Sequence, residues 1–182
     1  IAVLTRGCYR IMNRAEQVQE RPVDTIDWDL ETLALGGYSH FMQKEIHEQP
    51  RSVSQTLSGP LNVSEGTARL NGINLDSPDE FERIQRITML GCGTSWHAGL
   101  VGRHLVEQLA GIPVDVEIAS EFRTRRRLPM RDSVTVAISQ SGETPDTLEG
   151  VRPARGAGSH VLGLANVVGS TIARETDGGV YL

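Results

Sequence analysis

The second half of the chain alternates short apolar runs with longer stretches in which apolar residues recur every three or four positions. The short runs predict strands, and the longer repeats predict the helices between them. Five predicted strands, rich in Val, Ile, Leu or Ala, cover residues 87–90, 114–119, 134–138, 161–165 and 179–182. Apolar strands that alternate with helices are typical of a parallel sheet covered on both faces. We therefore expect an α/β fold built on a three-layer, doubly wound parallel sheet.

The longest helix in this half is predicted at residues 96–110. Its periodicity places Leu100, Val101, Leu105 and Leu109 against the sheet. Four shorter helices are predicted at residues 78–85, 121–127, 145–155 and 170–175. Ser120 is the expected N-cap of the second of these.

The first 37 residues have a different pattern, without alternation of strands and helices. Residues 1–12 predict a hairpin that turns at Arg6-Gly7. A hairpin alone is marginal in water, so we expect it to belong to a larger sheet. The acidic stretch at residues 24–37 predicts a linker, with Gly36-Gly37 as a flexible joint.

A helical segment comes next. Residues 38–49 predict an amphipathic helix that Pro50 interrupts, and residues 51–57 predict a second helix. Residues 60–76 show no period and are predicted to be irregular. Ser77-Pro78-Asp79-Glu80 is the sequence of a capping box and should open the next helix.

The most informative stretch joins the predicted strand at residues 134–138 to the helix that begins at Pro145. Between them lies Ser-Gln-Ser-Gly-Glu-Thr, residues 139–144, without the Lys of a P-loop. Thr144 suits the N-cap, and Pro145 suits the first helical position. Free N–H groups and hydroxyl donors at a helix start favour an anion such as a releasable phosphomonoester. The same pattern fits an ordinary capped strand-to-helix turn, so the motif alone leaves both interpretations open.

A second polar loop, Gly-Cys-Gly-Thr-Ser at residues 91–95, follows the first strand of the predicted sheet. It superficially resembles a dinucleotide-binding fingerprint, but Trp96 stands where the third glycine is required. Thr94 and Ser95 instead supply hydroxyl groups at a helix start. Because the carboxyl ends of parallel strands share one edge, this loop and residues 139–144 can face one ligand.

Composition narrows the range of functions. The chain has 182 residues with 38% apolar and 4% aromatic content, which fits an ordinary α/β protein. Its formal net charge of -5 disfavours nucleic-acid binding, and no apolar run is long enough for a bilayer. No signal peptide opens the chain, and an initial Ile suggests a fragment. Cys8 and Cys92 match no metal spacing and are expected to be free thiols in a reducing compartment.

Other candidate sites have weaker support. His40 and His47 could share a helix face, but no third ligand lies nearby, so we expect no metal. The basic run at residues 123–127 more simply forms a solvated face or subunit contact than a phosphate site. Cys92 has no evident partner that would make it a nucleophile, and a small packed residue is the simpler interpretation.

These motifs resemble the sugar isomerase (SIS) domain and, more closely, the isomerase half of the glutamine–fructose-6-phosphate aminotransferase family. The resemblance spans residues 38–182 and, more weakly, residues 1–37. The stretches that carry it are HFMQKEI at 40–46, EQP at 48–50, GCGTS at 91–95, DVEIASEFR at 115–123 and SQSGET at 139–144. The Lys-Glu-Ile and Glu-Gln-Pro stretch is specific to these aminotransferases, whereas SQSGET is shared widely among SIS proteins.

The resemblance implies a flavodoxin-like sheet and a set of substrate-binding residues. The residues that it places around the substrate phosphate are Ser95, Ser139, Gln140, Ser141 and Thr144. The residues that it places beside the sugar are Cys92, Gly93 and Thr94. It implies that the acid–base Glu, Lys and His lie beyond residue 182 or on a partner subunit, so no catalytic residue is assigned in this chain. We expect no cofactor.

The resemblance also implies a function and a domain division. Residues 1–26 would be the last hairpin of a glutaminase domain, 27–77 a linker with the helical segment, and 78–182 the first SIS domain. The whole enzyme would convert fructose 6-phosphate and glutamine to glucosamine 6-phosphate and glutamate as a cytoplasmic homodimer. This part would bind fructose 6-phosphate or glucosamine 6-phosphate, and glutamine would bind to the absent glutaminase domain. The alternative is a non-catalytic, phosphosugar-binding regulatory module.

Overall fold

The computed structural model describes residues 2–13, 17–19, 35–70, 72–75, 77–125 and 130–182. The chain divides into two compact units, Ile1–Ser52 and Val53–Leu182. Among the described helices, none is long and apolar enough to cross a membrane.

The first unit begins with the predicted hairpin. Strands β1 (Ala2–Thr5) and β2 (Cys8–Ile11) pair antiparallel, with Leu4 opposite Tyr9. Most of the predicted linker lies outside the described residues. Gly36 and Gly37, at its end, both adopt a positive φ in a turn.

Helix α2 (Phe41–Ser58) starts in the first unit and continues through Pro50. The prediction of two helices separated at Pro50 is therefore wrong. An internal proline costs about 3 kcal/mol because it loses one backbone hydrogen bond and crowds the preceding turn. The turns on either side keep their own hydrogen bonds, so a helix can continue past it. The apolar side chains of α2, including Met42 and Ile46, are exposed.

The second unit is built on a five-stranded sheet whose paired strands are all parallel, in the order β6-β5-β7-β8-β9. The strands are β5 (Arg86–Gly91), β6 (Val114–Ile118), β7 (Ser133–Ser139), β8 (His160–Ala165) and β9 (Gly178–Tyr181). In chain order this is 2-1-3-4-5, the flavodoxin-like arrangement, so the predicted fold class is confirmed. Strand order reverses between β5 and β7, where such sheets bind ligands.

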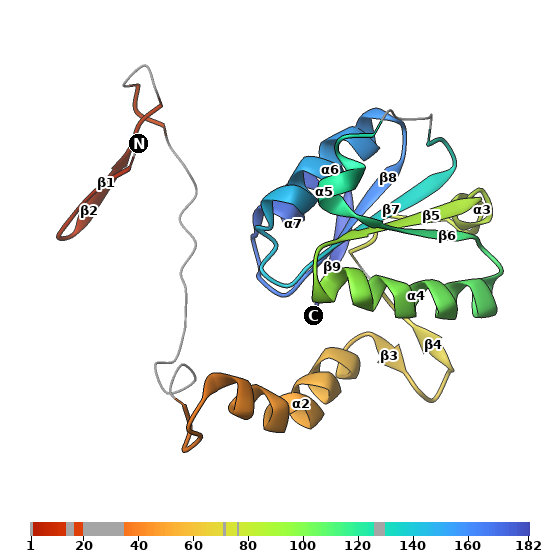
Figure 1. Ribbon diagram of the computed structural model, residues 1–182, viewed down its shortest axis with the longest axis horizontal. Coiled ribbons are helices and arrows are strands. Elements are labelled where there is room, and N and C mark those ends of the chain that lie inside the picture. The colour runs from red at the N-terminus through yellow and green to blue at the C-terminus, as the bar shows by residue number, and fades with distance from the viewer. Residues whose placement is uncertain (1, 14–16, 20–34, 71, 76, 126–129) are drawn as a thin grey trace. The chain divides into compact units, whose positions relative to one another are not determined.

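Helices cover both faces of this sheet. Helix α4 (Thr94–Ala110) packs on β5, β6 and β7, while α5 (Ala119–Phe122), α6 (Pro145–Gly156) and α7 (Thr171–Glu175) occupy the opposite face. Figure 1 shows the three layers, with α4 on one side and α6 and α7 on the other. A buried hydrophobic cluster lies on the α6 side and contains Ala137, Val151, Ala154, Val161 and Ile172.

The prediction of which α4 residues face the sheet is wrong. Gly99 is buried, and a Cβ on it would lie 2.9 Å from a methyl group of Val116. Val101 and Leu109 are 62% and 84% exposed, and Leu100 and Leu105 are exposed as well. Small residues at positions 99 and 102 let the helix backbone approach the sheet closely, so the leucines on the other side of the helix face outward.

Residues 60–76, predicted to be irregular, contain a small antiparallel hairpin. Its strands are β3 (Leu61–Asn62) and β4 (Thr67–Ala68). Strands of two residues are too short to produce a sequence period, so this hairpin could not have been predicted from the pattern.

Two helix starts test the capping predictions. Ser77 Oγ accepts a hydrogen bond from Glu80 N at 3.3 Å, and the Glu80 carboxylate accepts one from Ser77 N at 3.1 Å. This confirms the capping box of α3 (Pro78–Glu82). Ser120, in contrast, lies inside α5, whose N-cap is Ile118. Strand β6 runs directly into that helix, so no loop residue is left to cap it.

The outer side of edge strand β9 is covered by residues 72–74. Gly179 N donates to Gly72 O at 2.6 Å, and Asn74 Nδ2 donates to Asp177 O at 2.6 Å. These contacts occupy backbone groups that an open edge strand would expose to other chains.

A bidentate ion pair joins α6 to α7 and makes stability depend on pH. Arg152 Nε and Nη2 donate to the Glu175 carboxylate at 2.9 and 2.7 Å. These bonds lower the pKa of Glu175, so their stabilisation is present above its ordinary pKa and is lost as pH falls through the lowered value. We expect Glu175→Gln to be less stable than the wild type at pH 7. The two proteins should be equally stable once the pH is below the lowered pKa of Glu175. Urea unfolding between pH 3 and 7 measures this, and Glu149→Gln, which leaves both bonds in place, is the control. A Glu175→Gln deficit that persists unchanged at pH 3 would contradict the assignment.

Candidate functional site

The two polar loops predicted from the sequence lie at neighbouring strand ends. Strand β5 ends at Gly91 and leads into α4, and β7 ends at Ser139 and leads into α6. Because β5 and β7 are parallel and adjacent, both loops lie at the carboxyl edge of the sheet, where the strand order reverses. This is the place at which doubly wound sheets bind ligands.

The loop at residues 139–144 is held in shape by its own hydroxyl groups. Ser139 is only 2% exposed, and its Oγ accepts a hydrogen bond from Gly142 N at 3.1 Å. The same Oγ lies 2.8 Å from Thr144 Oγ1. The hydroxyl of Ser139 is therefore engaged inside the loop, which is a structural role that the sequence pattern did not reveal.

The outward side of this loop carries Gln140 and Ser141, both exposed. Ser141 Oγ accepts from Glu143 N at 3.2 Å, so its own hydrogen is available to a ligand. Thr144 is the N-cap of α6 and Pro145 follows at the helix start, both as predicted. The Thr144 side chain makes no capping bond, because it pairs with Ser139 instead.

The loop rests directly on the connection between β8 and α7. Gln140 O accepts from Asn166 N at 3.1 Å, and Gly142 O accepts from Ile172 N at 3.0 Å. Gly142 has a φ of 64°, and a Cβ on it would overlap the buried side chain of Ser170. These bracing residues were missed in the sequence, since they follow a different strand and carry no motif.

The side chain of Glu143 is turned toward α7. Its Oε1 accepts from Thr171 N at 2.7 Å, at the first residue of that helix. The hydrogen bonds from Thr171 lower the pKa of the Glu143 carboxyl, and the charge of Arg174 lowers it further. Glu143 therefore remains ionised and attached to α7 near neutral pH.

The second loop places small polar groups at the start of α4. Gly93 is the N-cap with a φ of 55°, and no side chain caps this helix start. Thr94 is exposed, and Cys92 and Ser95 are half-buried. Cys92 is a free thiol, as is Cys8. Ser95 N donates to Cys92 O at 3.2 Å, but no side chain caps this first turn, whose N–H groups point in the direction that favours anions.

Candidate proton-transfer groups near these loops are each engaged. His97 Nδ1 lies 2.8 Å from Gly93 O, which orients its ring, and no feature of the sequence had indicated this partner. Glu121 pairs with Arg125 at 3.6 Å, and Asp146 in the first turn of α6 pairs with Arg123 at 3.3 Å. Two members of the basic run thus balance nearby carboxylates.

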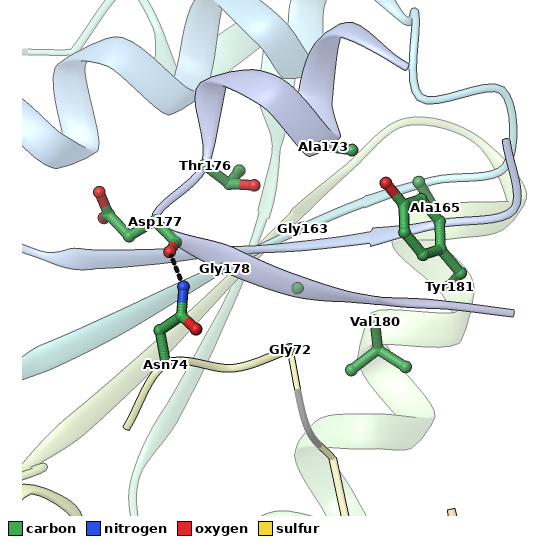
Figure 2. A pocket seen from close by; sticks show the side chains of 11 residues that line it. Gly72, Asn74, Gly163, Ala165, Ala173, Thr176, Asp177, Gly178, Val180 and Tyr181 are labelled. Carbon is green, nitrogen blue, oxygen red and sulfur yellow. Dashed lines mark hydrogen bonds between the residues drawn. The ribbon is translucent and has the colours of Figure 1, made fainter. Parts of the chain in front are cut away.

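A hollow of about 300 Å³ lies elsewhere, along β9. Figure 2 shows Asn74 on one side of this strand and Thr176 on the other, with the Asn74–Asp177 bond dashed. The Asp177 carboxylate is already taken by Arg155 at 2.6 Å and by Val161 N at 2.8 Å. The remaining lining is mostly Gly and Ala, so the hollow offers few polar groups to a ligand.

Among the side chains that the structure describes, no group of three or more His, Cys, Asp or Glu residues could hold a metal ion. His47 stacks on Tyr38 instead, with ring centroids 5.3 Å apart.

Comparison with known sequences identifies relatives for the whole chain. The SIS domain profile matches residues 80–182. Glutamine–fructose-6-phosphate aminotransferase [isomerizing] of Chlorobaculum tepidum is 46% identical over 181 residues, and that of Symbiobacterium thermophilum is 49% identical over 181 residues. Enzyme 1 of the same name from Rattus norvegicus is 44% identical over 174 residues. The chain spans 29%, 30% and 25% of these three relatives, respectively.

Solved structures share the fold. The C-terminal domain of glucosamine-fructose-6-phosphate aminotransferase from Francisella tularensis is 37% identical, with a TM-score of 0.70 over 81% of this chain and 40% of that one. Tagatose-6-phosphate ketose/aldose isomerase from Escherichia coli is 16% identical, with a TM-score of 0.64 over 79% of this chain and 40% of that one. The second likeness concerns the fold alone.

Proposed function

This chain belongs to the SIS domain family, and from that premise we propose that it is the phosphosugar-binding, first isomerase half of a glutamine–fructose-6-phosphate aminotransferase. The observation that carries the proposal is the identity of 46% with such an enzyme along the full chain, hairpin and helical segment included. A regulatory SIS module would not require a match over residues 1–77. The whole enzyme would convert fructose 6-phosphate and glutamine to glucosamine 6-phosphate and glutamate.

The loop at residues 139–144 is the proposed phosphate site. Ser141 and Thr144 would donate their hydroxyl hydrogens to the phosphate, and Gln140 would donate from its amide. A relay in which Ser139 donates to Thr144 leaves the Thr144 hydrogen for the ligand. The dipole of α6 adds favourable charge, while Asp146 in its first turn is balanced by Arg123.

The loop at residues 91–95 would complete the substrate site. Ser95 would reach the phosphate from the start of α4, and Cys92, Gly93 and Thr94 would lie beside the sugar. Binding at two helix starts would fix the open-chain sugar, so that a base outside this chain can move a proton between C1 and C2. No residue of this chain is assigned as that base, and we expect the reaction to need no cofactor.

The proposal includes the setting of the whole enzyme. Residues 1–26 would be the end of a glutaminase domain that handles glutamine, 27–77 the connecting segment, and 78–182 the first SIS domain. The enzyme would act as a cytoplasmic homodimer.

Replacing Ser141 tests the phosphate site. We expect Ser141→Ala to weaken fructose 6-phosphate binding by about 1–3 kcal/mol, the scale for losing a hydrogen bond to a charged group. Isothermal titration calorimetry of the chain with fructose 6-phosphate measures this. Ser64→Ala, which removes an exposed hydroxyl from the β3–β4 turn, is the control and should bind like the wild type. The site would be refuted if Ser141→Ala bound fructose 6-phosphate as tightly as the wild type and a crystal soak placed the phosphate away from residues 139–144.

A further inference from the structure

The phosphate loop is attached to α7 and to the segment that precedes it at three points, of which only one uses a side chain. The bonds from Asn166 N and Ile172 N end on backbone carbonyls of the loop. The third, from Thr171 N at 2.7 Å, ends on the carboxylate of Glu143. A substitution can therefore remove this attachment while the backbone bonds remain.

Glu143 also links the attachment to the ligand-facing side of the loop. Its backbone N donates to Ser141 Oγ at 3.2 Å, while its side chain reaches in the other direction, to Thr171. If the carboxylate were released, it could turn toward the bound phosphate and repel it. Holding Glu143 on α7 thus fixes the orientation of Ser141 and keeps a negative charge away from an anion.

The groups that face this carboxylate support the same arrangement. Arg174 of α7 acts on it through its charge and also donates to Thr171 Oγ1 at 2.9 Å and to Gly169 O. The N–H of Thr171, the first residue of α7, has no partner within its own helix, so Glu143 satisfies it.

We propose that Glu143 is a positioning residue, whose hydrogen bond to Thr171 N holds the phosphate loop in its binding conformation. This inference rests on the proposed function, because it assigns a role within the same site. Glu143 would not touch the substrate. It would act through Ser141 and through the placement of its own charge.

The inference predicts different results for two substitutions of one residue. Glu143→Ala removes the acceptor and should weaken fructose 6-phosphate binding about tenfold, the scale of one net hydrogen bond. Glu143→Gln keeps an acceptor oxygen and should bind within about twofold of the wild type, since the amide can still take the N–H of Thr171. Calorimetric titration with fructose 6-phosphate, beside thermal unfolding of each variant, provides the two readouts.

Glu175→Ala is the matched control. Glu175 is the last residue of α7, and its carboxylate accepts two hydrogen bonds from Arg152 of α6. The substitution therefore removes an attachment at the end of α7 that lies away from Thr171. It should lower the unfolding temperature without changing affinity. An equal loss of affinity in Glu175→Ala would mean that general destabilisation of α7 is responsible, and would overturn the inference.

Thr171→Pro tests the donor side if Glu143→Ala does not fold. Proline fits the first position of a helix, and Ser170 has the extended ψ of 163° that a residue before proline adopts. This variant deletes the N–H together with the Thr171 hydroxyl that accepts from Arg174, and it should also lose about tenfold in affinity. Thr171→Val, which loses the hydroxyl but keeps the N–H, is its control and should bind like the wild type.

The outcomes separate this inference from the function itself. Wild-type binding with unchanged affinity in Glu143→Ala and Thr171→Pro would overturn the positioning role alone. Equal weakening in Glu143→Ala and Glu143→Gln would also overturn it, because the acceptor would then be irrelevant. A wild-type chain that does not bind fructose 6-phosphate would overturn the proposed function and this inference together.

Discussion

Gly142→Ala is expected to abolish most of the affinity for fructose 6-phosphate. Gly142 adopts a φ of 64°, which costs an alanine about 1–2 kcal/mol. The added Cβ would also overlap Ser170 Oγ and Cβ and would lie 3.4 Å from Ala165 Cβ. Ser170 is buried and cannot move aside, so the loop would lift from α7. We expect a loss of affinity of more than tenfold, measured by calorimetry, and a lower unfolding temperature.

A second substitution isolates the steric part of this effect. The Ser170 hydroxyl has no hydrogen-bond partner and does not cap α7, although Ser170 is its N-cap residue. Glycine is an acceptable N-cap, so Ser170→Gly alone should be nearly silent. In the double variant the overlap disappears, and part of the affinity should return as a coupling between two contacting sites. Full affinity in Gly142→Ala alone would contradict the loop geometry.

The chain by itself is expected to produce no glucosamine 6-phosphate. Glutamine hydrolysis needs an activated nucleophile and an oxyanion site, and the exposed β1–β2 hairpin offers neither. Isomerisation needs a base within hydrogen-bond reach of the substrate. Such a base typically increases the reaction rate by a factor of about 10²–10⁴. Near the two loops, Glu143 is held by Thr171 and Glu121 is paired with Arg125.

The assay supplies the purified chain with fructose 6-phosphate and either glutamine or ammonium. Product above a boiled control would contradict the assignment of the base to another part of the enzyme. His97 would then be the first candidate, because its ring is oriented by Gly93 O. His97→Asn would test it, with His104→Asn on the same helix as the control.

The order of strands and helices in the second unit was determined by the sequence. A short apolar run such as residues 134–138 is typical of a strand buried on both faces. Because helices alternate with these strands, each helix crosses over the sheet and the strands it connects are parallel. The capping box at Ser77 and the helix start at Pro145 are likewise local, because their partners lie within a few residues. Because such capping interactions involve only neighbouring residues, they set where a helix begins independently of the strand order.

The loop at residues 139–144 was also recognisable as a candidate phosphate site, because its strand, hydroxyl groups and helix start are contiguous. The contacts that hold this loop in place could not be recognised in the sequence. Asn166, Ser170, Thr171 and Ile172 reach the loop only because β8 pairs beside β7 in the sheet. No spacing in the sequence relates Glu143 to Thr171, so their bond depends on the strand order.

Tertiary structure likewise decided which side of α4 packs on the sheet. The leucine period was genuine, but it described the exposed side, and Gly99 gave the closer approach to β5 and β6. A helical period identifies an apolar stripe but does not predict which surface packs against it, because a surface other than the sheet can also cover the stripe. The pattern along the chain therefore determined the elements and the location of the candidate site, and packing between distant segments determined how that candidate site is held.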